Sequence, residues 1–331
     1  AATLGGAITI TDYEVVTITI TDGTLTSGGN ISVTPTTNAS SELKISGTSG
    51  LTMASGHIIT SQKIDASGTV LANTTDSGLI MATSTVAAGG AIITGSNGVD
   101  TLYGSNSSDS VSTGTGNDAI YTQGGADTIN LTSGGEDDIF ITGNTTSADV
   151  AVTKINNFNA GIVTGSSDEV DIDLSDLEAH LAAADSGAAV ISAADIVDGD
   201  AVSLITGTAT LVQTISPNVT STLDGGRGVF LLSGYDLSSM DDVETALESG
   251  GVFAIKTSVA FDDQTGDSRA DGIFVVYSDG TDAYLAVAYN ESDSNSLNGF
   301  SSGSLDVQDL IIFSDISDVT DFAAVNFDWT T

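Results

Sequence analysis

Five aspartates recur at nearly even spacing in the middle of this chain, and each is followed two residues later by an aliphatic residue. They lie 9, 9, 9 and 10 residues apart, at Asp100, Asp109, Asp118, Asp127 and Asp137. The aliphatic residues are Leu102, Val111, Ile120, Ile129 and Ile139. Each aspartate closes a hexad rich in glycine and small polar residues. Carboxylates on such turns are ligands for hard divalent cations, so the pattern predicts metal binding.

Each repeat predicts a tight turn followed by a short strand, because glycine and asparagine accept left-handed backbone angles and a triad with one aliphatic residue follows. One unit cannot bury its aliphatic side chain alone. Two units forming one 18-residue coil would stack their aliphatic side chains into a continuous internal ladder. Alternate aspartates would then line opposite edges, with coils roughly 4.8 Å apart. One edge would carry Asp100, Asp118 and Asp137, and the other Asp109 and Asp127.

Carboxylates stacked at this spacing repel by about 3 kcal/mol per neighbouring pair at an effective dielectric constant near 20. No lysine or arginine lies between Gly95 and Phe140 to offset this repulsion. Ca²⁺ would offset it, since it takes about six to eight oxygen ligands and the turns offer carboxylates and backbone carbonyls. We therefore expect the repeat to fold only with calcium; the alternative is a metal-free solenoid edge. The expected carbonyl ligands lie near Gly95, Gly98, Gly104, Gly114, Gly116, Gly124, Gly125, Gly134 and Gly135.

The pattern resembles the GGxGxDxUx nonapeptide of the RTX (repeats-in-toxin) proteins, a calcium-binding β-helix repeat. The resemblance implies ions between Asp100 and Asp118, between Asp118 and Asp137, and between Asp109 and Asp127. It is imperfect, because glycines of the motif are replaced by Ser107, Thr113, Thr122 and Thr132. The implied fold is all-β: a right-handed parallel β-solenoid or β-roll with stacked calcium-binding turns, followed by a β-rich C-terminal domain with one or two short helices.

Composition limits the function classes. Six lysines and arginines against 44 aspartates and glutamates give a net charge of −38, which argues against nucleic acid and anionic membrane surfaces as partners. The chain has no cysteine, so disulfides and thiolate metal sites are excluded. It has no run of 18 apolar residues that would span a membrane. Its first residues lack the basic start and long apolar run of a secretory signal peptide.

The segments on either side of the repeat are also predicted to be β-rich. Residues 1–94 read as short strands separated by Ser, Gly or Asp, which suits a β-solenoid sharing one axis with the roll at 95–145. Their Thr/Ala/Ser-rich texture resembles the solenoid of calcium-dependent bacterial surface-layer (S-layer) proteins. Residues 146–181 resemble the segment that closes RTX rolls: Phe158 would plug the ladder, and Ser175 would start a helical cap.

Residues 182–331 are predicted to form a C-terminal β-rich domain. It contains a capped helix with Val243, Ala246 and Leu247 on one face and a hairpin turned at Asp279-Gly280. The domain is similar to the C-terminal domains of proteins exported by type I secretion, and the resemblance makes the acidic tail DVTDFAAVNFDWTT an uncleaved export signal. Core packing is the alternative role for its aromatic residues, Phe322, Phe327 and Trp329.

Two further acidic groups are weaker candidates for calcium sites. The closing segment carries Asp168, Asp171 and Asp173, and a loop of the C-terminal domain carries Asp262, Asp263, Asp267 and Asp271. The spacing in that loop does not fit an EF-hand, and solvated acidic turns are the alternative for both groups. No catalytic or cofactor-binding residue is predicted. The string Gly299-Phe300-Ser301-Ser302-Gly303 matches a nucleophile elbow, but both histidines, His57 and His180, precede it.

Two function classes remain open. The first is a calcium-hardened structural protein that tiles a bacterial cell surface or builds a filament, with calcium driving folding and assembly. Its expected partners are copies of itself, the type I secretion machinery and cell-surface polysaccharide, and its expected location is extracellular. The second is the calcium-binding and export region of an RTX enzyme, toxin or adhesin with its active module upstream. Whether residues 1–94 form a solenoid, and whether calcium produces sheets or filaments, would separate them.

Overall fold

The structure is a computed structural model that describes most of the chain. The described residues are 2–35, 40–82, 90–132, 135–141, 152–161, 167–173, 212–218, 221–223, 229–248, 250–253, 255–257, 272–290 and 305–330. They fall into two compact units. The first takes in Ala1–Asn144, Thr153–Asn159 and Val163–Asp171, and the second takes in Thr145–Val152, Ala160–Ile162 and Ile172–Thr331.

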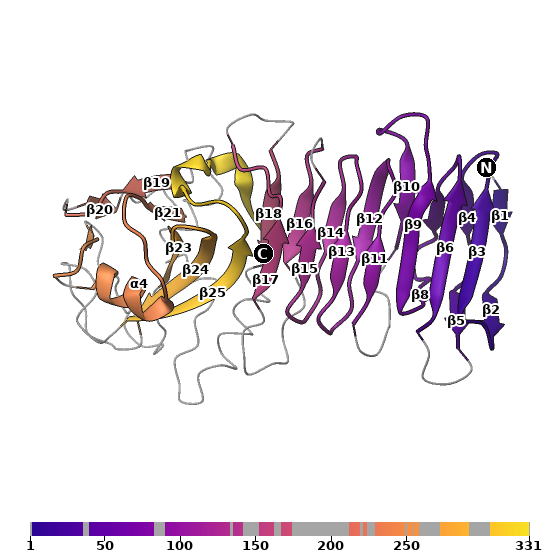
Figure 1. The fold of residues 1–331 in the computed structure, drawn as a ribbon, viewed down its shortest axis with the longest axis horizontal. Helices are drawn as coiled ribbons and strands as arrows, with labels where there is room; N and C mark the ends of the chain where they lie inside the picture. Colours follow the sequence, from indigo (N-terminus) through magenta and orange to yellow (C-terminus); the bar gives the residue numbers. More distant parts are fainter. Residues whose placement is uncertain are drawn as a thin grey trace. The chain divides into compact units, whose positions relative to one another are not determined.

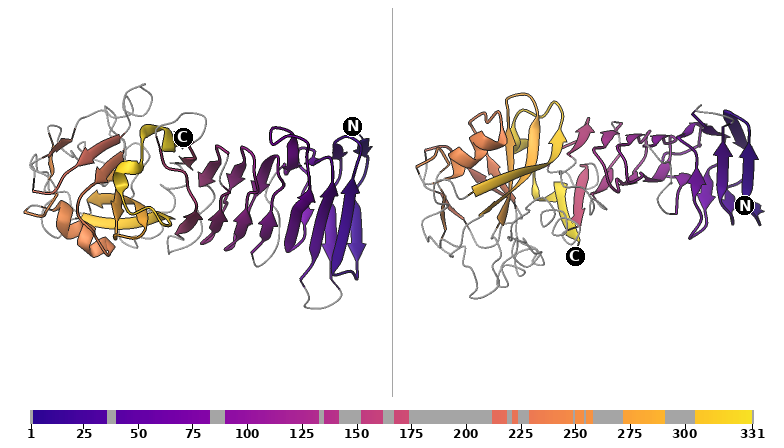
Figure 2. Two further views of the ribbon diagram at one scale, coloured as in Figure 1. Left: turned by 45° about the horizontal axis from the view of Figure 1, so that its top comes forward. Right: turned by 90° about the horizontal axis from the view of Figure 1, so that it is seen from below.

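The first unit is a β-solenoid in which strands of successive coils stack side by side (Figures 1 and 2). One sheet contains β1 (Ala2–Leu4), β4 (Leu25–Ser27), β7 (Leu51–Met53), β10 (Ser77–Ile80), β12 (Val99–Tyr103), β14 (Ala119–Tyr121), β16 (Asp138–Ile141) and β18 (Glu169–Asp173). A second contains β3 (Val15–Ile20), β6 (Glu42–Gly47), β9 (Lys63–Thr69), β11 (Ile92–Thr94), β13 (Ser110–Ser112), β15 (Thr128–Asn130) and β17 (Thr153–Asn156). A third contains β2 (Ile8–Thr11), β5 (Ile31–Thr34) and β8 (Ile59–Thr60).

Pairing within these sheets is parallel, which confirms the predicted solenoid. In the repeat region, Leu102 lies opposite Ile120 and Val111 opposite Ile129, so two repeats make one coil of 18 residues. The sheets continue without interruption from the first coils into the repeats, because β10 pairs with β12 and β9 with β11. The N-terminal segment and the roll therefore share one axis.

Coil length decides how many faces the solenoid has. Before the repeats, Leu25 lies opposite Leu51 and Leu51 opposite Leu79, so these coils are 26 and 28 residues long and have room for a third strand. In the repeats, hexad turns join the strands directly and only two faces remain. Aliphatic side chains fill the interior as predicted. The ladder on one sheet is Leu102, Ile120, Ile139 and Val170, and on the other Val111, Ile129 and Ile155, all buried.

The segment after the roll continues the stack. Ile155 in β17 lies opposite Ile129 in β15, and the following Phe158 is buried. Asn157 between them has a φ of 62°, a left-handed conformation that asparagine tolerates. The burial of Phe158 is what its expected role as a plug requires. The helical cap expected from Ser175 lies outside the described residues.

The second unit is built around a mixed sheet with strand order β19-β21-β23-β24-β25. Its strands are β19 (Val212–Ile215), β21 (Val229–Leu232), β23 (Gly272–Ser278), β24 (Ala283–Asn290) and β25 (Leu305–Phe313). The first three run parallel and the last three antiparallel. The predicted hairpin at Asp279-Gly280 is present, with Gly280 at a φ of 90°. A separate parallel pair consists of β20 (Ser221–Leu223) and β22 (Ile255–Thr257).

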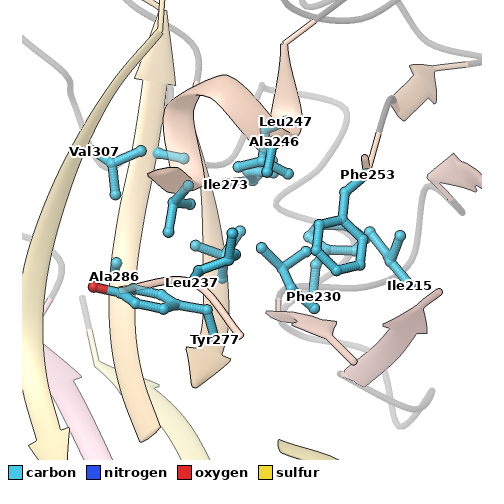
Figure 3. Packing of buried hydrophobic residues seen from close by; sticks show 14 of the residues in the cluster. Ile215, Phe230, Leu237, Ala246, Leu247, Phe253, Ile273, Tyr277, Ala286 and Val307 are labelled. Carbon is cyan, nitrogen blue, oxygen red and sulfur yellow. The ribbon is translucent and has the colours of Figure 1, made fainter. Parts of the chain in front are cut away.

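Helix α4 (Met240–Leu247) packs in the core of the second unit (Figure 3). It begins after Ser239, whose side chain accepts a hydrogen bond from the Asp242 N–H. The predicted face is correct, since Val243, Ala246 and Leu247 are buried together with side chains of the sheet. No helix in the described part of the chain is long and apolar enough to cross a membrane.

The C-terminal tail contains two short 3₁₀ helices, η1 (Val319–Asp321) and η2 (Ala324–Asn326), and β26 (Phe327–Thr330). Phe322 and Phe327 are buried and lie 5.6 Å apart between ring centroids, and Phe322 also contacts Phe313. Packing within the second unit thus accounts for these two aromatic residues. It leaves the predicted export role of the tail untested, and the Trp329 side chain lies outside what the structure describes.

Truncation of one ladder residue tests the solenoid core. Ile120→Ala should lower the free energy of unfolding by about 2–5 kcal/mol, because Ile120 is fully buried and its removal leaves a cavity. The matched control is Ile92→Ala, since Ile92 lies on β11 with 48% of its surface exposed and should cost less than about 0.5 kcal/mol. Denaturant unfolding at saturating calcium measures both. Equal losses of unfolding free energy in the two variants would contradict the position of the Ile120 side chain inside the solenoid.

Candidate metal centre

The five repeat aspartates form two columns on opposite edges of the roll. Consecutive members of each column come from successive coils, because the strands that follow them pair in register. All five are buried, with no more than 5% of their surface exposed. The first column is Asp100, Asp118 and Asp137, and the second is Asp109 and Asp127. The spacing of the repeat alone therefore placed the carboxylates correctly.

Each column is joined by hydrogen bonds from a backbone N–H to the carboxylate of the next coil. The Asp100 N–H donates to Asp118 Oδ1 at 2.8 Å, and the Asp118 N–H donates to Asp137 Oδ1 at 2.9 Å. On the other edge, the Asp109 N–H donates to Asp127 Oδ1 at 2.8 Å. One oxygen of each carboxylate from the later coils is thus fixed by the coil before it.

A sixth aspartate extends the first column. The Asp137 N–H donates to Asp168 Oδ1 at 3.1 Å, and Asp168 Oδ2 accepts a 2.7 Å hydrogen bond from the Asn159 N–H. Asp168 was a weaker candidate from sequence, and the structure brings it to the main column. It is 31 residues from Asp137 and belongs to no glycine-rich hexad, so the period of the repeat does not predict its position in the column.

Of the remaining weaker candidates, the structure describes the side chain of Asp171 alone. Asp171 is buried but lies within strand β18 rather than in a turn. Asp173 is the last residue of the same strand, and its side chain is not among those that the structure describes. The acidic loop with Asp262, Asp263, Asp267 and Asp271 also lies outside the described residues, so its predicted low-affinity site stays a prediction.

Two carboxylate oxygens, one in each column, lack a hydrogen-bond partner. Asp118 Oδ2 and Asp127 Oδ2 are buried, and no described donor reaches either atom. A buried, unpaired carboxylate oxygen is costly and is normally compensated by a hydrogen bond, a proton or a metal ion. These two atoms are therefore where a cation would be expected to bind.

Burial raises the pKa of most of these carboxyl groups. The pKa of Asp118 and that of Asp127 rise to about 8, that of Asp137 to about 7, and those of Asp100 and Asp168 to about 6. Loss of hydration is the main cause in every case, and neighbouring carboxylates add to it at Asp118, Asp127 and Asp137. Without a bound cation, the protonated forms of Asp118 and Asp127 are thus favoured near neutral pH.

Close approach between coils requires glycine in the turns. A Cβ on Gly114 would overlap the Ser96 carbonyl oxygen, and one on Gly135 would overlap the Gly116 carbonyl oxygen. Gly114 also has a φ of 96°, which favours glycine. Backbone oxygens of neighbouring coils therefore lie against the turns beside the carboxylates. Similar approaches occur at Gly95, Gly98, Gly104, Gly116 and Gly125; Gly134 lies outside the described residues.

The donor set fits calcium. It consists of carboxylate and carbonyl oxygens, which Ca²⁺ prefers over the nitrogen and sulfur ligands typical of zinc. No cluster of three or more acidic, histidine or cysteine side chains in the described residues would hold a metal by itself. An ion here would need carbonyl oxygens as well as the aspartates. When bound, it would neutralise the stacked carboxylates.

Comparison with known proteins identifies the repeat. Residues 94–129 match the family model of the RTX calcium-binding nonapeptide repeat (4 copies). No curated protein and no solved structure matches the chain. The matched residues include Asp100, Asp109, Asp118 and Asp127, whereas the copy that ends at Asp137 lies beyond the match. This stretch is therefore an RTX repeat, and calcium is the ion that such repeats bind.

The stability of the calcium-free roll should fall as pH rises. The raised pKa values mean that the folded roll holds protons that the unfolded chain, with aspartate pKa values near 3.9, has already released. The stabilisation that the folded roll gains from holding these protons is complete below about pH 4 and is lost as pH rises through about 6 to 8. Thermal unfolding of calcium-stripped protein between pH 5 and 9 measures it. The double variant Asp118→Asn, Asp127→Asn should flatten the profile, and a stability that rises with pH would contradict the prediction.

Substitution of a turn glycine tests the close approach between coils. Gly114→Ala should lower the free energy of unfolding by about 2–5 kcal/mol, because it adds both left-handed strain and overlap with Ser96. Gly56→Ala is the control, since Gly56 also has a positive φ (79°) but no atom within 4 Å of the added Cβ, and should cost about 1–2 kcal/mol. Denaturant unfolding with saturating calcium compares them. A cost for Gly114→Ala no larger than the control would show that the coils can separate freely there.

Proposed function

Since residues 94–129 are RTX calcium-binding repeats, we propose that this chain is a secreted structural protein that assembles into a bacterial surface layer or extracellular filament in a calcium-dependent way. The observation that carries the proposal is the double column of buried aspartates in a stretch without lysine or arginine. Such a stack holds together only when cations or protons neutralise it. Calcium is then the trigger that folds the roll of the exported chain.

Folding would be linked to export. Inside the cell, scarce calcium leaves the roll unfolded and suited to passage through the type I secretion machinery. Outside, millimolar calcium fills sites whose affinity is expected at roughly 10⁻⁴ to 10⁻³ M, the range of extracellular modules. Because an unfolded chain has no preformed site, the binding energy becomes folding energy. The acidic tail would serve as the export signal.

Assembly would use the surplus of negative charge. A net charge of −38 keeps copies apart unless divalent cations bridge them, so calcium would control association as well as folding. The first coil also offers a surface for stacking. Ile8, Ile10 and Ile18 in this coil are only partly buried, whereas their counterparts Ile31, Val33 and Ile45 in the next coil are buried. A further coil, from whichever chain supplies it, would cover them. Cell-surface polysaccharide is a further proposed partner.

A second candidate function is the calcium-binding and export region of an RTX enzyme, toxin or adhesin. One observation favours it: the family match is confined to the repeat, a module that would serve an exported catalytic protein equally well. The two candidates share the folding step and differ in whether the folded chain associates with itself.

Electron microscopy and light scattering of the full chain, with millimolar calcium and after chelation, separate the candidates. Ordered sheets or filaments should form with calcium, dissolve on chelation and not form with magnesium, which dehydrates reluctantly and demands stricter geometry. The double variant Asp118→Asn, Asp127→Asn should fail to assemble. Folded, monodisperse monomers of the unaltered chain at millimolar calcium would contradict the assembly proposal and favour the second candidate.

A further inference from the structure

The first four turns of the roll are of two backbone types, and the residue in the second position of each hexad separates them. This position is Ser96, Ser105, Gly114 and Gln123 in successive turns. Gly114 and Gln123 are left-handed, with φ of 96° and 65°. Neither serine has a positive φ. The repeat is therefore periodic in sequence but not uniform in conformation.

In the two serine turns, the protein itself satisfies the aspartate. Asp100 Oδ2 accepts from the Ser96 N–H at 2.6 Å, the Ser96 hydroxyl lies 3.0 Å from Oδ1, and the Leu79 N–H donates to Oδ1 at 2.5 Å. The second turn repeats the arrangement, with donation to Asp109 from the Ser105 N–H, the Ser105 hydroxyl and the Ala91 N–H at 2.5, 2.8 and 2.5 Å. Both oxygens of each carboxylate are thus engaged.

In the two left-handed turns, the corresponding donors are missing from the carboxylate. Asp118 and Asp127 each keep the hydrogen bond from the preceding coil on Oδ1. Their Oδ2 atoms are buried and have no partner among the described groups. The N–H of a left-handed residue points in a different direction from that of a residue with negative φ, so the Gly114 and Gln123 positions differ from Ser96 and Ser105 in their backbone donor. Neither glycine nor glutamine has the hydroxyl that serine contributes.

We propose that calcium is held in the first four turns through Asp118 and Asp127, and that Ser96 and Ser105 make Asp100 and Asp109 metal-independent structural residues. This inference rests on the proposed calcium-dependent folding and refines it. An ion that took Asp100 or Asp109 as ligand would compete with donors that already engage both carboxylate oxygens, whereas at Asp118 and Asp127 it would compensate an oxygen that now has no partner.

The serine turns also join the roll to the coils before it. The amides that donate to Asp100 and Asp109 belong to Leu79 and Ala91, which precede the repeats. The junction thus contains two carboxylates that are stabilised by hydrogen bonds from the protein rather than by a metal ion. It would remain folded when calcium is removed and would offer a preformed coil on which the calcium-dependent part can stack.

The calcium content of four variants of the full chain tests the proposal. Asp118→Asn and Asp127→Asn should each lower the number of ions bound per chain, measured by elemental analysis after equilibrium dialysis, or weaken binding about tenfold or more in calorimetry. Asp100→Asn and Asp109→Asn should leave number and affinity unchanged. An equal loss of calcium in all four folded variants would overturn the proposal. If the unaltered chain binds no calcium, the proposed function itself fails.

Because Asp100→Asn could unfold the junction, substitutions of Ser96 provide an independent test. Ser96→Gly removes the hydroxyl and permits the left-handed conformation, so the first turn should adopt the left-handed type. The number of calcium ions bound per chain, or their affinity, should then increase. Ser96→Ala removes the hydroxyl but disfavours that conformation, so calcium binding should not increase. Hydrogen exchange after chelation should show protection of the Leu79 and Ala91 amides and loss of protection from Thr113 to Ile141. No gain in Ser96→Gly together with uniform loss of protection would contradict the inference.

Discussion

The structure depends on a conflict between two consequences of the same 18-residue register. Parallel stacking at this register places every aliphatic side chain of the repeat above another and buries the ladder from Leu102 to Ile139. It also places the aspartates above one another, where burial and neighbouring carboxylates raise the pKa of Asp118 and that of Asp137. A shift of register that separated the charges would expose the aliphatic residues. The charges must therefore be neutralised in place.

The coils that precede the repeats provide strands on which the first repeats can stack. Their length leaves room for a third strand and a wider core, so they have no need of acidic turns. Where the coil shortens to two faces, the sheets continue and the last amides of the wide coils bond to the first aspartates. The roll is thus built on an edge that already presents strands in the correct register.

The arrangement of the roll could largely be predicted from the sequence. The period of the repeat and its residue types fix which side chains face inward and which edge each aspartate joins. The backbone type of each turn could not be predicted. Ser96 and Gly114 occupy equivalent positions, yet the Ser96 N–H donates to Asp100 in its own turn, whereas Gly114 lies against the Ser96 carbonyl of the preceding coil. Asp168 reaches its column through a long connection that no period describes. In the second unit, the local hairpin at Asp279-Gly280 was predictable, whereas the parallel pairing of β19, β21 and β23 joins distant segments without a sequence signal.

The described core of the second unit is built from apolar side chains rather than from stacked carboxylates. Its core consists of side chains such as Phe230, Leu247 and Phe253, whose burial favours folding without an ion. Its partly buried Asp309 accepts a 2.8 Å hydrogen bond from the Tyr277 hydroxyl, whereas Asp118 and Asp127 in the roll each have a carboxylate oxygen without a partner. The same contrast separates Asp100 from Asp118 inside the roll. In the proposed assignment, a buried carboxylate depends on calcium where no protein donor reaches it, and the local backbone conformation decides whether a donor is present.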